Sequence, residues 1–259
     1  MGGGEPQRLD SPPPAREARG GEGSGVGGSS AAEERAVAWA NADAPDIVRE
    51  SLARFAGHIA LVSSFGADSA VLLHMVAAVD KAAPVLFVDT LRLFPETLAY
   101  RDRLITHLRL SNVQTVGPGA EAVARHDPAA TLAETDPDAC CAFRKVTPLD
   151  DALSPFDAWI TGRRRTQAET RADLPAAEWD GTRVKINPLA AWTDEHVATY
   201  RRAHDLPEHP LAALGFPSIG CWPCTSPVAP SENPRAGRWR GSAKTECGIH
   251  RPAAVPKGS

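Results

Sequence analysis

Short apolar runs alternate with stretches of helical periodicity over the first two thirds of the chain. Four of these runs read as β-strands and span residues 58–65, 83–90, 112–116 and 156–162. Helical patterns follow the first two runs, at residues 69–79 and 94–108, and two shorter ones precede the first, at residues 31–57. Strands that alternate with helices predict an α/β fold, in which helices flank a parallel sheet on both faces.

Both ends of the chain differ from this middle part. Residues 1–32 hold nine of the 21 glycines and no aromatic residue, so we expect a disordered leader that buries too little apolar surface to offset its ordering entropy. The last third predicts one clear helix, at about residues 194–204 with Thr193 as its cap, and otherwise loops rich in Pro and Gly. We therefore divide the chain into the leader, a domain at 33–230 and a mobile tail at 231–259.

Composition narrows the class of protein. The net charge of −4 argues against nucleic-acid binding by bulk charge. No apolar run approaches the roughly 18 residues of a membrane span, and the N-terminus lacks a secretion signal pattern, so we expect a cytoplasmic protein without membrane contact. Five cysteines in such a protein indicate metal or redox chemistry more than structural disulfides.

Polar loops follow three of the predicted strands and would meet at the carboxyl edge of the sheet. The loop "SSFGADS" at residues 63–69 leads into a helix, where small residues and free N–H groups suit an anion; a plain tight turn is the alternative. It matches neither the Walker A nor the GxGxxG pattern. The second loop carries Asp89, Thr90 and Leu91.

Arginines are concentrated in the third of these loops. The stretch "TGRRRTQAETR" supplies Arg163, Arg164, Arg165 and Arg171. Such a run by itself is most often a solvated face, but ligands of open parallel sheets bind at the carboxyl ends of strands. Three strand-end loops that offer small residues and arginines together favour a ligand that carries phosphate.

Four of the cysteines form two close pairs, "CC" at 140–141 and "CWPC" at 221–224. The second pair alone could be a redox dithiol, half of a zinc site or half of an iron–sulfur site. Adjacent cysteines strain a single tetrahedral zinc ion, whereas a cubane cluster offers each of them a separate iron corner. Four thiolates from two close pairs therefore suit a 4Fe–4S cluster on Cys140, Cys141, Cys221 and Cys224 better than four unrelated buried cysteines.

The fifth cysteine, Cys247, lies in the tail sequence "KTECGIH" and is left free by this assignment. A thiol near His250 and Lys244 can have a lowered pKa and act as a nucleophile. An inert surface cysteine or an alternative metal ligand are the competing interpretations of this residue.

Several stretches together resemble the assimilatory phosphosulfate reductases, and within them the iron–sulfur branch that acts on adenosine 5′-phosphosulfate. They include "SSFGAD", "VDTLRLFPET", "CCAFRKVTPL", "WITGRRRTQAETR", "GFPSIGCWPCT" and "ECGIH", in family order from about residue 60 to residue 250. The resemblance implies an adenine-nucleotide α-hydrolase-like fold, also called a PP-loop fold, with an irregular C-terminal tail. It also implies that Cys247 is the catalytic nucleophile and that the paired cysteines hold the cluster.

The same resemblance assigns a set of substrate contacts. The loop after the first strand would face the phosphosulfate, the next loop and Gly162 the nucleoside, and four basic residues the anionic groups. These residues are Ser63, Ser64, Phe65, Gly66, Asp89, Thr90, Leu91, Lys145, Gly162, Arg171, Arg235 and Arg238.

The implied reaction is thioredoxin-dependent reduction of adenosine 5′-phosphosulfate to sulfite and AMP through an S-sulfocysteine at Cys247. A homo-oligomer is compatible with the pattern. Three alternatives stay open at this point: the same reaction on 3′-phosphoadenosine 5′-phosphosulfate, an ATP-dependent thiolation enzyme with the same sheet core, and a non-catalytic iron–sulfur sensor. The second would need an "SGGxDS" loop, which "SSFGADS" does not match.

Overall fold

A computed structural model describes residues 24–242 and 244–250. In this part of the chain a six-stranded sheet has the strand order β3-β2-β1-β4-β6-β5. Its strands are β1 (Ile59–Ser63), β2 (Val85–Val88), β3 (Val113–Val116), β4 (Ala158–Ile160), β5 (Ala177–Trp179) and β6 (Val184–Ile186). Neighbouring strands run parallel except β5, which is antiparallel to β6. The predicted α/β fold is confirmed, and two strands that the sequence did not predict, β6 and the antiparallel edge strand β5, extend the sheet beyond β4.

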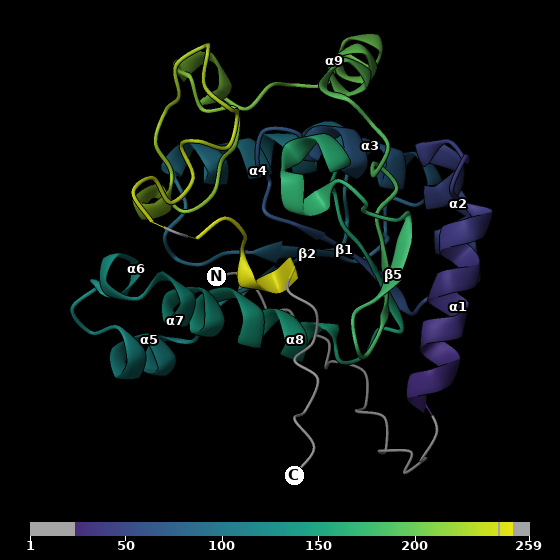
Figure 1. The fold of residues 1–259 in the computed structure, drawn as a ribbon, viewed down its shortest axis with the longest axis horizontal. Coiled ribbons are helices and arrows are strands. Elements are labelled where there is room, and N and C mark those ends of the chain that lie inside the picture. Colours follow the sequence, from purple (N-terminus) through teal and green to yellow (C-terminus); the bar gives the residue numbers. More distant parts are fainter. Residues whose placement is uncertain (1–23, 243, 251–259) are drawn as a thin grey trace, which may run out of the picture.

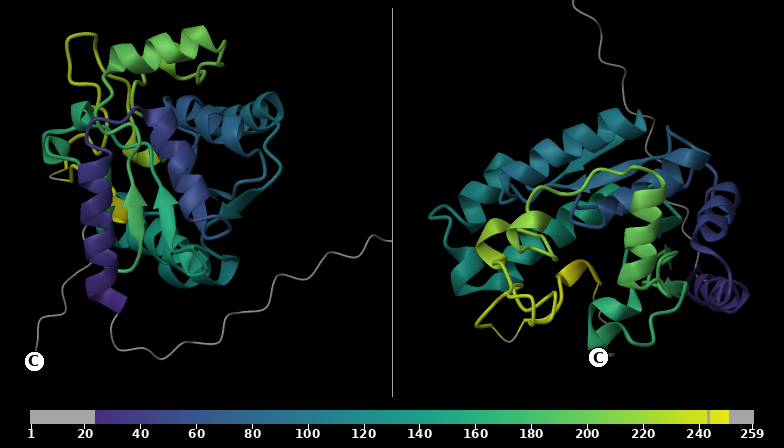
Figure 2. Two further views of the ribbon diagram at one scale, coloured as in Figure 1. Left: turned by 90° about the vertical axis from the view of Figure 1, so that its right-hand side faces the viewer. Right: turned by 90° about the horizontal axis from the view of Figure 1, so that it is seen from above.

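Helices cover both faces of this sheet (Figure 1). On one side lie α3 and α4, on the other α7 and α8, and α1 stands along the edge beside β5 (Figure 2). The α-helices are α1 (Ser24–Ala38), α2 (Ala44–Arg54), α3 (Ser69–Val79), α4 (Pro95–Leu108), α5 (Ala120–His126), α6 (Leu132–Thr135), α7 (Pro137–Cys141), α8 (Thr147–Leu153) and α9 (Asp194–Ala203). A π-helical turn, η1 (Ala142–Val146), joins α7 to α8. Short 3-10 turns are η2 (Arg165–Gln167), η3 (Glu169–Arg171), η4 (Ala212–Leu214), η5 (Trp222–Cys224) and η6 (Gly248–His250).

The apolar runs of the central strands bury both faces because each face has its own core. On β1, Ile59 and Leu61 belong to the larger cluster under α2, α3 and α4, while Ala60 and Val62 belong to a second cluster with Leu149 of α8. Side chains alternate between the two faces of a strand, so a strand covered on both faces is apolar at every position. This double burial fixes the strand ends, and with them the loops at the carboxyl edge.

The expected disordered leader is wrong for residues 24–32. These residues form the first turns of α1, and Ala32 is buried in the larger core. A Cβ atom on Gly28 would come within 2.3 Å of the Trp179 ring of β5, so a glycine there permits the helix to approach the edge strand closely. The rest of the expected leader, residues 1–23, lies outside the described residues.

One further expectation, for the last third of the chain, needs correction. The chain from residue 185 onward was expected to hold one helix and otherwise loops, yet its first two residues belong to β6, which is paired with β4 and β5. Hydrogen bonds join the predicted tail to the predicted domain, since Trp239 N–H donates to the Cys224 carbonyl at 3.0 Å and Ser226 N–H to that of Gly237 at 2.9 Å. The mobility of the tail stays a prediction.

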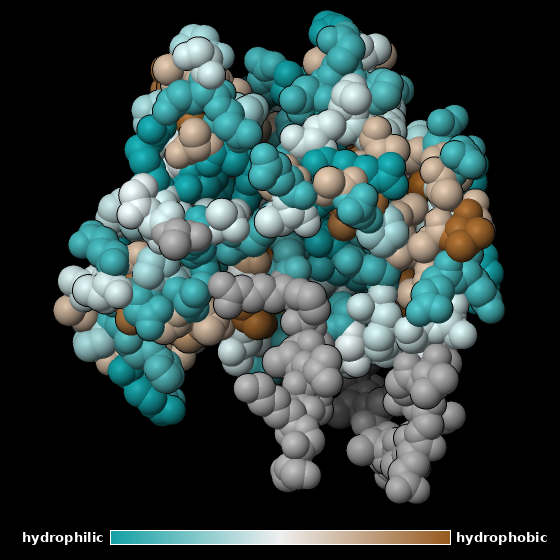
Figure 3. Space-filling view, in the orientation of Figure 1, coloured by the Kyte–Doolittle hydropathy of each residue, from teal (hydrophilic) through white to brown (hydrophobic). Residues whose placement is uncertain are grey.

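The face shown in Figure 3 is largely hydrophilic, and its hydrophobic residues are scattered in small patches. Across residues 24–242 and 244–250, no helix is both long enough and apolar enough to cross a membrane.

Candidate active site

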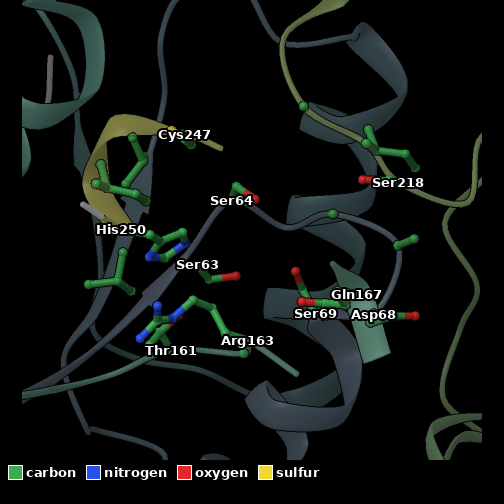
Figure 4. A pocket seen from close by; sticks show the side chains of 18 of the residues that line it. Ser63, Ser64, Asp68, Ser69, Thr161, Arg163, Gln167, Ser218, Cys247 and His250 are labelled. Atoms are coloured by element: carbon green, nitrogen blue, oxygen red, sulfur yellow. The ribbon is translucent and has the colours of Figure 1, made fainter. Parts of the chain in front are cut away.

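A pocket opens at the carboxyl edge of the sheet, where the loops after β1 and β4 meet the C-terminal tail (Figure 4). Ten of the residues that the sequence assigned to substrate or catalysis line it: Ser63, Ser64, Gly66, Thr90, Lys145, Gly162, Arg171, Arg235, Arg238 and Cys247. Three of the assigned residues, Phe65, Asp89 and Leu91, are not among the lining residues. The structure therefore gathers most of the expected site from five separate segments of the chain.

The loop after β1 turns its backbone toward the pocket because Phe65 turns its ring away. Phe65 has a positive φ of 51°, is fully buried and packs edge-on against Phe87, with 5.3 Å between the ring centroids. Its N–H donates to the Ser63 hydroxyl oxygen at 3.1 Å. A positive φ is costly for a bulky residue, and the buried ring contact offsets that cost. Phe65 thus shapes the loop instead of facing the pocket.

The loop after β2 likewise places only some of its assigned residues at the pocket. Thr90 is buried, and its hydroxyl lies 3.2 Å from Cys221 Sγ. Leu91 has a φ of 58° and is 57% exposed, while its N–H donates to Asp89 Oδ1 at 2.8 Å. The loop therefore connects the pocket to the "CWPC" segment, and Leu91 points to solvent.

Five cationic side chains line the pocket: Lys145, Arg163, Arg171, Arg235 and Arg238. Burial lowers the pKa of both Arg163 and Arg235 to about 10, and the charge of Arg171 adds to each shift. Cations that disfavour each other's charge in this way form a site that an anion stabilises. A Cβ on Gly220 would lie 2.3 Å from the Arg238 guanidinium, so this glycine leaves room for that side chain.

The three consecutive arginines after β4 have different partners. Arg163 lines the pocket and contacts Asn187 Oδ1 through Nη2 at 3.2 Å. Arg164 instead bridges Asp68 and Asp194, with both nitrogen–oxygen distances at 2.6 Å. Arg165 donates to the Leu174 carbonyl. One arginine of the three thus faces the ligand site, and the pattern alone does not distinguish it from its neighbours.

The tail closes one side of the pocket. Ile249 packs against the second core cluster, and the His250 ring stacks on Trp159 with 6.4 Å between centroids and 5° between planes. Burial, followed by the charges of Lys185 and Arg163, lowers the pKa of His250 well below its usual value, so its imidazole is neutral. His250 Nδ1 is buried and has no hydrogen-bond partner within the described part of the chain.

Cys247 faces both a thiol and an ammonium group. A hydrogen bond with the Cys141 thiol lowers the pKa of Cys247, burial opposes this, and the charge of Lys145 lowers it further. For Lys145, burial disfavours the charged form, but the thiols of Cys221, Cys247 and Cys141 raise its pKa. A thiol with this environment favours the thiolate, the form that acts as a nucleophile.

The four paired cysteines lie on two neighbouring segments and form no disulfide. Cys140 and Cys141 end α7 and are buried, while Cys221 directly precedes η5 and Cys224 is its last residue. Burial raises the pKa of Cys140, and the charges of Cys221 and Cys224 act on it as well. Within residues 24–242 and 244–250, no three metal-ligating side chains converge on one ion.

Sequence reasoning missed several pocket residues. Gln167, Ser218, Glu246 and His250 line the pocket but were not assigned to the substrate. Glu246 and His250 lie in the "ECGIH" stretch itself, so their proximity to Cys247 was the available signal. Ser218 comes from a loop with no periodicity, and only the fold brings it there.

A cationic pocket at the carboxyl edge of a parallel sheet, with a thiol in its wall, defines an α/β protein suited to an anionic ligand. Residues 58–227 match the family model described as phosphoadenosine phosphosulfate reductase domain. The chain therefore belongs to the phosphoadenosine phosphosulfate reductase family, whose members are reductases and thus oxidoreductase enzymes.

Individual relatives agree with this assignment. The chain is 58% identical over 196 residues to the adenosine 5′-phosphosulfate reductase of Chelativorans sp. (strain BNC1), covering 76% of this chain and 80% of the relative. It is 44% identical over 224 residues to the phosphoadenosine 5′-phosphosulfate reductase of Gloeobacter violaceus, covering 84% and 92%. The crystal structure of phosphoadenylyl-sulfate reductase from Candida auris, a phosphate complex, superimposes with a TM-score of 0.64 at 26% identity, covering 76% and 96%.

Proposed function

We propose that this protein reduces adenosine 5′-phosphosulfate to sulfite and AMP, with thioredoxin as the electron donor, in assimilatory sulfate reduction. The observation that carries the proposal is that Cys247, Lys145 and the arginines line one pocket together with the loop after β1. The relative from Chelativorans, which is 58% identical, is named for this substrate.

In this proposal different parts of the pocket bind the two ends of the substrate. The loop of Ser63, Ser64 and Gly66, at the N-terminus of α3, receives the anionic end through N–H and hydroxyl groups. Lys145, Arg171, Arg235 and Arg238 neutralise it. The nucleoside lies toward Gly162 and the loop of Asp89, Thr90 and Leu91. Contacts of Phe65, Asp89 and Leu91 with substrate stay predictions, since these residues do not line the pocket.

The chemical step is an attack of the Cys247 thiolate on the sulfur of the phosphosulfate. A sulfur–sulfur bond forms, the bond from sulfur to the bridging oxygen breaks, and its electron pair leaves on AMP. A thiolate of thioredoxin then attacks Cys247 Sγ, which forms a mixed disulfide and releases sulfite. The second thioredoxin thiol attacks this mixed disulfide, closes the thioredoxin disulfide and releases Cys247 as a thiolate. The two electrons that reduce the sulfur come from this dithiol, and two protons are released.

Cationic side chains make this encounter of two anions feasible. The attacking thiolate and the sulfonyl group repel each other, and charge builds on the AMP phosphate as the bond breaks. Lys145 and the arginines stabilise both charges in a pocket that is partly closed to water. A tail that opens after this step would expose the adduct to thioredoxin.

A 4Fe–4S cluster on Cys140, Cys141, Cys221 and Cys224 belongs to the same proposal. Four free thiols on two segments, with Cys221 and Cys224 near enough to Cys140 to raise its pKa, match the donor set of such a cluster. The fourth, Cys141, contacts Cys247. When bound, the cluster would supply a compact group of charge beside Lys145, and both electrons of the reaction would still come from thiols.

Reduction of 3′-phosphoadenosine 5′-phosphosulfate is the second candidate. It is favoured by the relative from Gloeobacter violaceus, which is 44% identical and named for that substrate. A cytoplasmic location and a homo-oligomeric state remain predictions.

The deciding experiment is anaerobic sulfite release from each nucleotide by iron-loaded protein with thioredoxin and its reductase. We expect strong turnover of adenosine 5′-phosphosulfate; comparable or better turnover of the 3′-phosphorylated substrate would favour the second candidate. Cys247→Ser should abolish sulfite release while it leaves nucleotide binding and the iron absorption spectrum intact. A protein-bound sulfite adduct on that variant would refute the role of Cys247.

A further inference from the structure

The carboxylate of Glu246 is bound by two of the arginines that the proposed function assigns to the substrate. Glu246 Oε1 lies 2.7 Å from Arg171 Nε, and Oε2 lies 2.7 Å from Arg171 Nη2. Arg235 Nη2 lies 3.5 Å from Oε2. The three side chains are largely buried, with 8%, 17% and 18% of Arg171, Arg235 and Glu246 exposed. Glu246 thus makes a bidentate, charge-assisted contact with Arg171 inside the pocket.

This contact has the geometry with which a guanidinium binds a phosphate or sulfate. Two oxygens of one anion face the two nitrogens of one arginine fork, and a phosphosulfate offers the same pair of oxygens. Burial raises the pKa of Glu246, but the hydrogen bonds from Arg171 and its charge lower the pKa more strongly, so the group is a carboxylate. The tail therefore brings its own anion into the cationic pocket.

Glu246 also differs from the other acidic residue of the pocket lining. Asp68 is paired with Arg164, which does not line the pocket. A substrate anion in the pocket therefore does not compete with Asp68 for an arginine. It could not bind Arg171 through both nitrogens while Glu246 holds them, and a second anion beside that carboxylate would be repelled.

We propose that the Glu246 carboxylate occupies the position of a substrate anion in the free protein. It leaves Arg171 and Arg235 when the phosphosulfate binds. The inference rests on the proposed function of the pocket. Because Glu246 directly precedes Cys247, its departure changes the backbone that positions the thiol, which in this structure contacts Cys141. Substrate occupancy and the position of the nucleophile are thereby coupled.

Two anchors can hold the tail while Glu246 moves. Lys244 forms an ion pair with Asp138 of α7. On the other side of Cys247, Ile249 packs on the second core cluster. The exchange at Arg171 thus requires a local movement between two fixed points, and it does not require the whole tail to leave.

The test is equilibrium binding of adenosine 5′-phosphosulfate to the Cys247→Ser protein and to the same protein carrying Glu246→Gln. Removal of the competing charge should tighten binding about tenfold, which corresponds to about 1.4 kcal/mol. Glu246→Ala should change affinity in the same direction, so the result does not depend on one variant. Binding that is unchanged or weaker in both variants would show that Glu246 is not a competitor.

The matched control is Glu232→Gln. Glu232 is another carboxylate of the same C-terminal region, but it pairs with Arg240 and does not line the pocket. The affinity for the nucleotide should be unchanged in this variant. A gain equal to that of Glu246→Gln would show that net charge, and not the contact with Arg171, causes the effect. Failure of the Cys247→Ser parent to bind the nucleotide would instead count against the proposed function itself.

Discussion

Arg144 and Asp127 form a buried ion pair, with 2.7 Å between Nη2 and Oδ2 and only 3% and 2% of the side chains exposed. Arg144 also donates to the Thr90 carbonyl at 3.0 Å, so it ties the turn η1 to the strand-end loop after β2. The next residue in the chain is Lys145. The pair therefore positions the segment that carries both Lys145 and the first two cysteines of the proposed cluster.

Replacing Asp127 by Ala should destabilise the protein strongly. The change leaves the Arg144 guanidinium buried without its charge partner, which costs about 3–5 kcal/mol in comparable buried pairs. Urea unfolding of both proteins measures the difference. Glu121→Gln is the control, because the exposed pair of Glu121 with Arg125 is worth at most about 0.5 kcal/mol. Equal effects of the two changes would contradict the importance of the buried pair.

Lys185 should make stability depend on pH above neutrality. It is buried beside Trp159, and burial, followed by the charge of Arg163, lowers its pKa from 10.5 to about 7. Between these values the unfolded chain binds a proton that the folded protein has released. The free energy of unfolding should therefore rise with pH in this window, by at most about 1.4 kcal/mol per pH unit.

The variant Lys185→Met lacks this contribution, whereas Lys81→Met, at an exposed position, should keep the wild-type profile. Urea unfolding at pH 7, 8 and 9 gives the free energy of unfolding of the three proteins. Groups that titrate alike in all three do not affect the difference between a variant and the wild type. Parallel profiles for wild type and Lys185→Met would show that Lys185 keeps an ordinary pKa.

Ile249→Ala should loosen the tail and slow the first chemical step. The side chain packs on the second core cluster next to Cys247, and truncation of a half-buried Ile costs about 1–2 kcal/mol of docking. Tryptic cleavage after Lys244 should be about tenfold faster, and formation of the S-sulfocysteine adduct slower by a similar factor. Val37→Ala in α1, where Val37 is 79% exposed, is the control. Unchanged cleavage would mean that Ile249 does not anchor the tail.

Local sequence patterns were sufficient to predict the strands and helices that bury a continuous apolar run. Residues 59–62 of β1 and all of β2 are apolar because two cores cover them, and this pattern is visible without any partner. The cysteine pairs and the "ECGIH" stretch likewise carry their chemistry in residue type and spacing. For these features the amino-acid sequence alone determined the fold class, the family resemblance and the assignment of Cys247.

Tertiary structure decided what depends on neighbours distant in the chain. The first turns of α1 are glycine-rich, and they are ordered against the ring of Trp179, about 150 residues away. The buried position of the Phe65 side chain depends on its contact with the ring of Phe87, which lies on another strand. Arg163, Arg164 and Arg165 are alike in sequence, and only the positions of Asn187, Asp68 and Leu174 give each a separate role. Likewise, the contact of Glu246 with Arg171 joins residues 75 positions apart, because electrostatic partners are selected by distance in space and not along the chain.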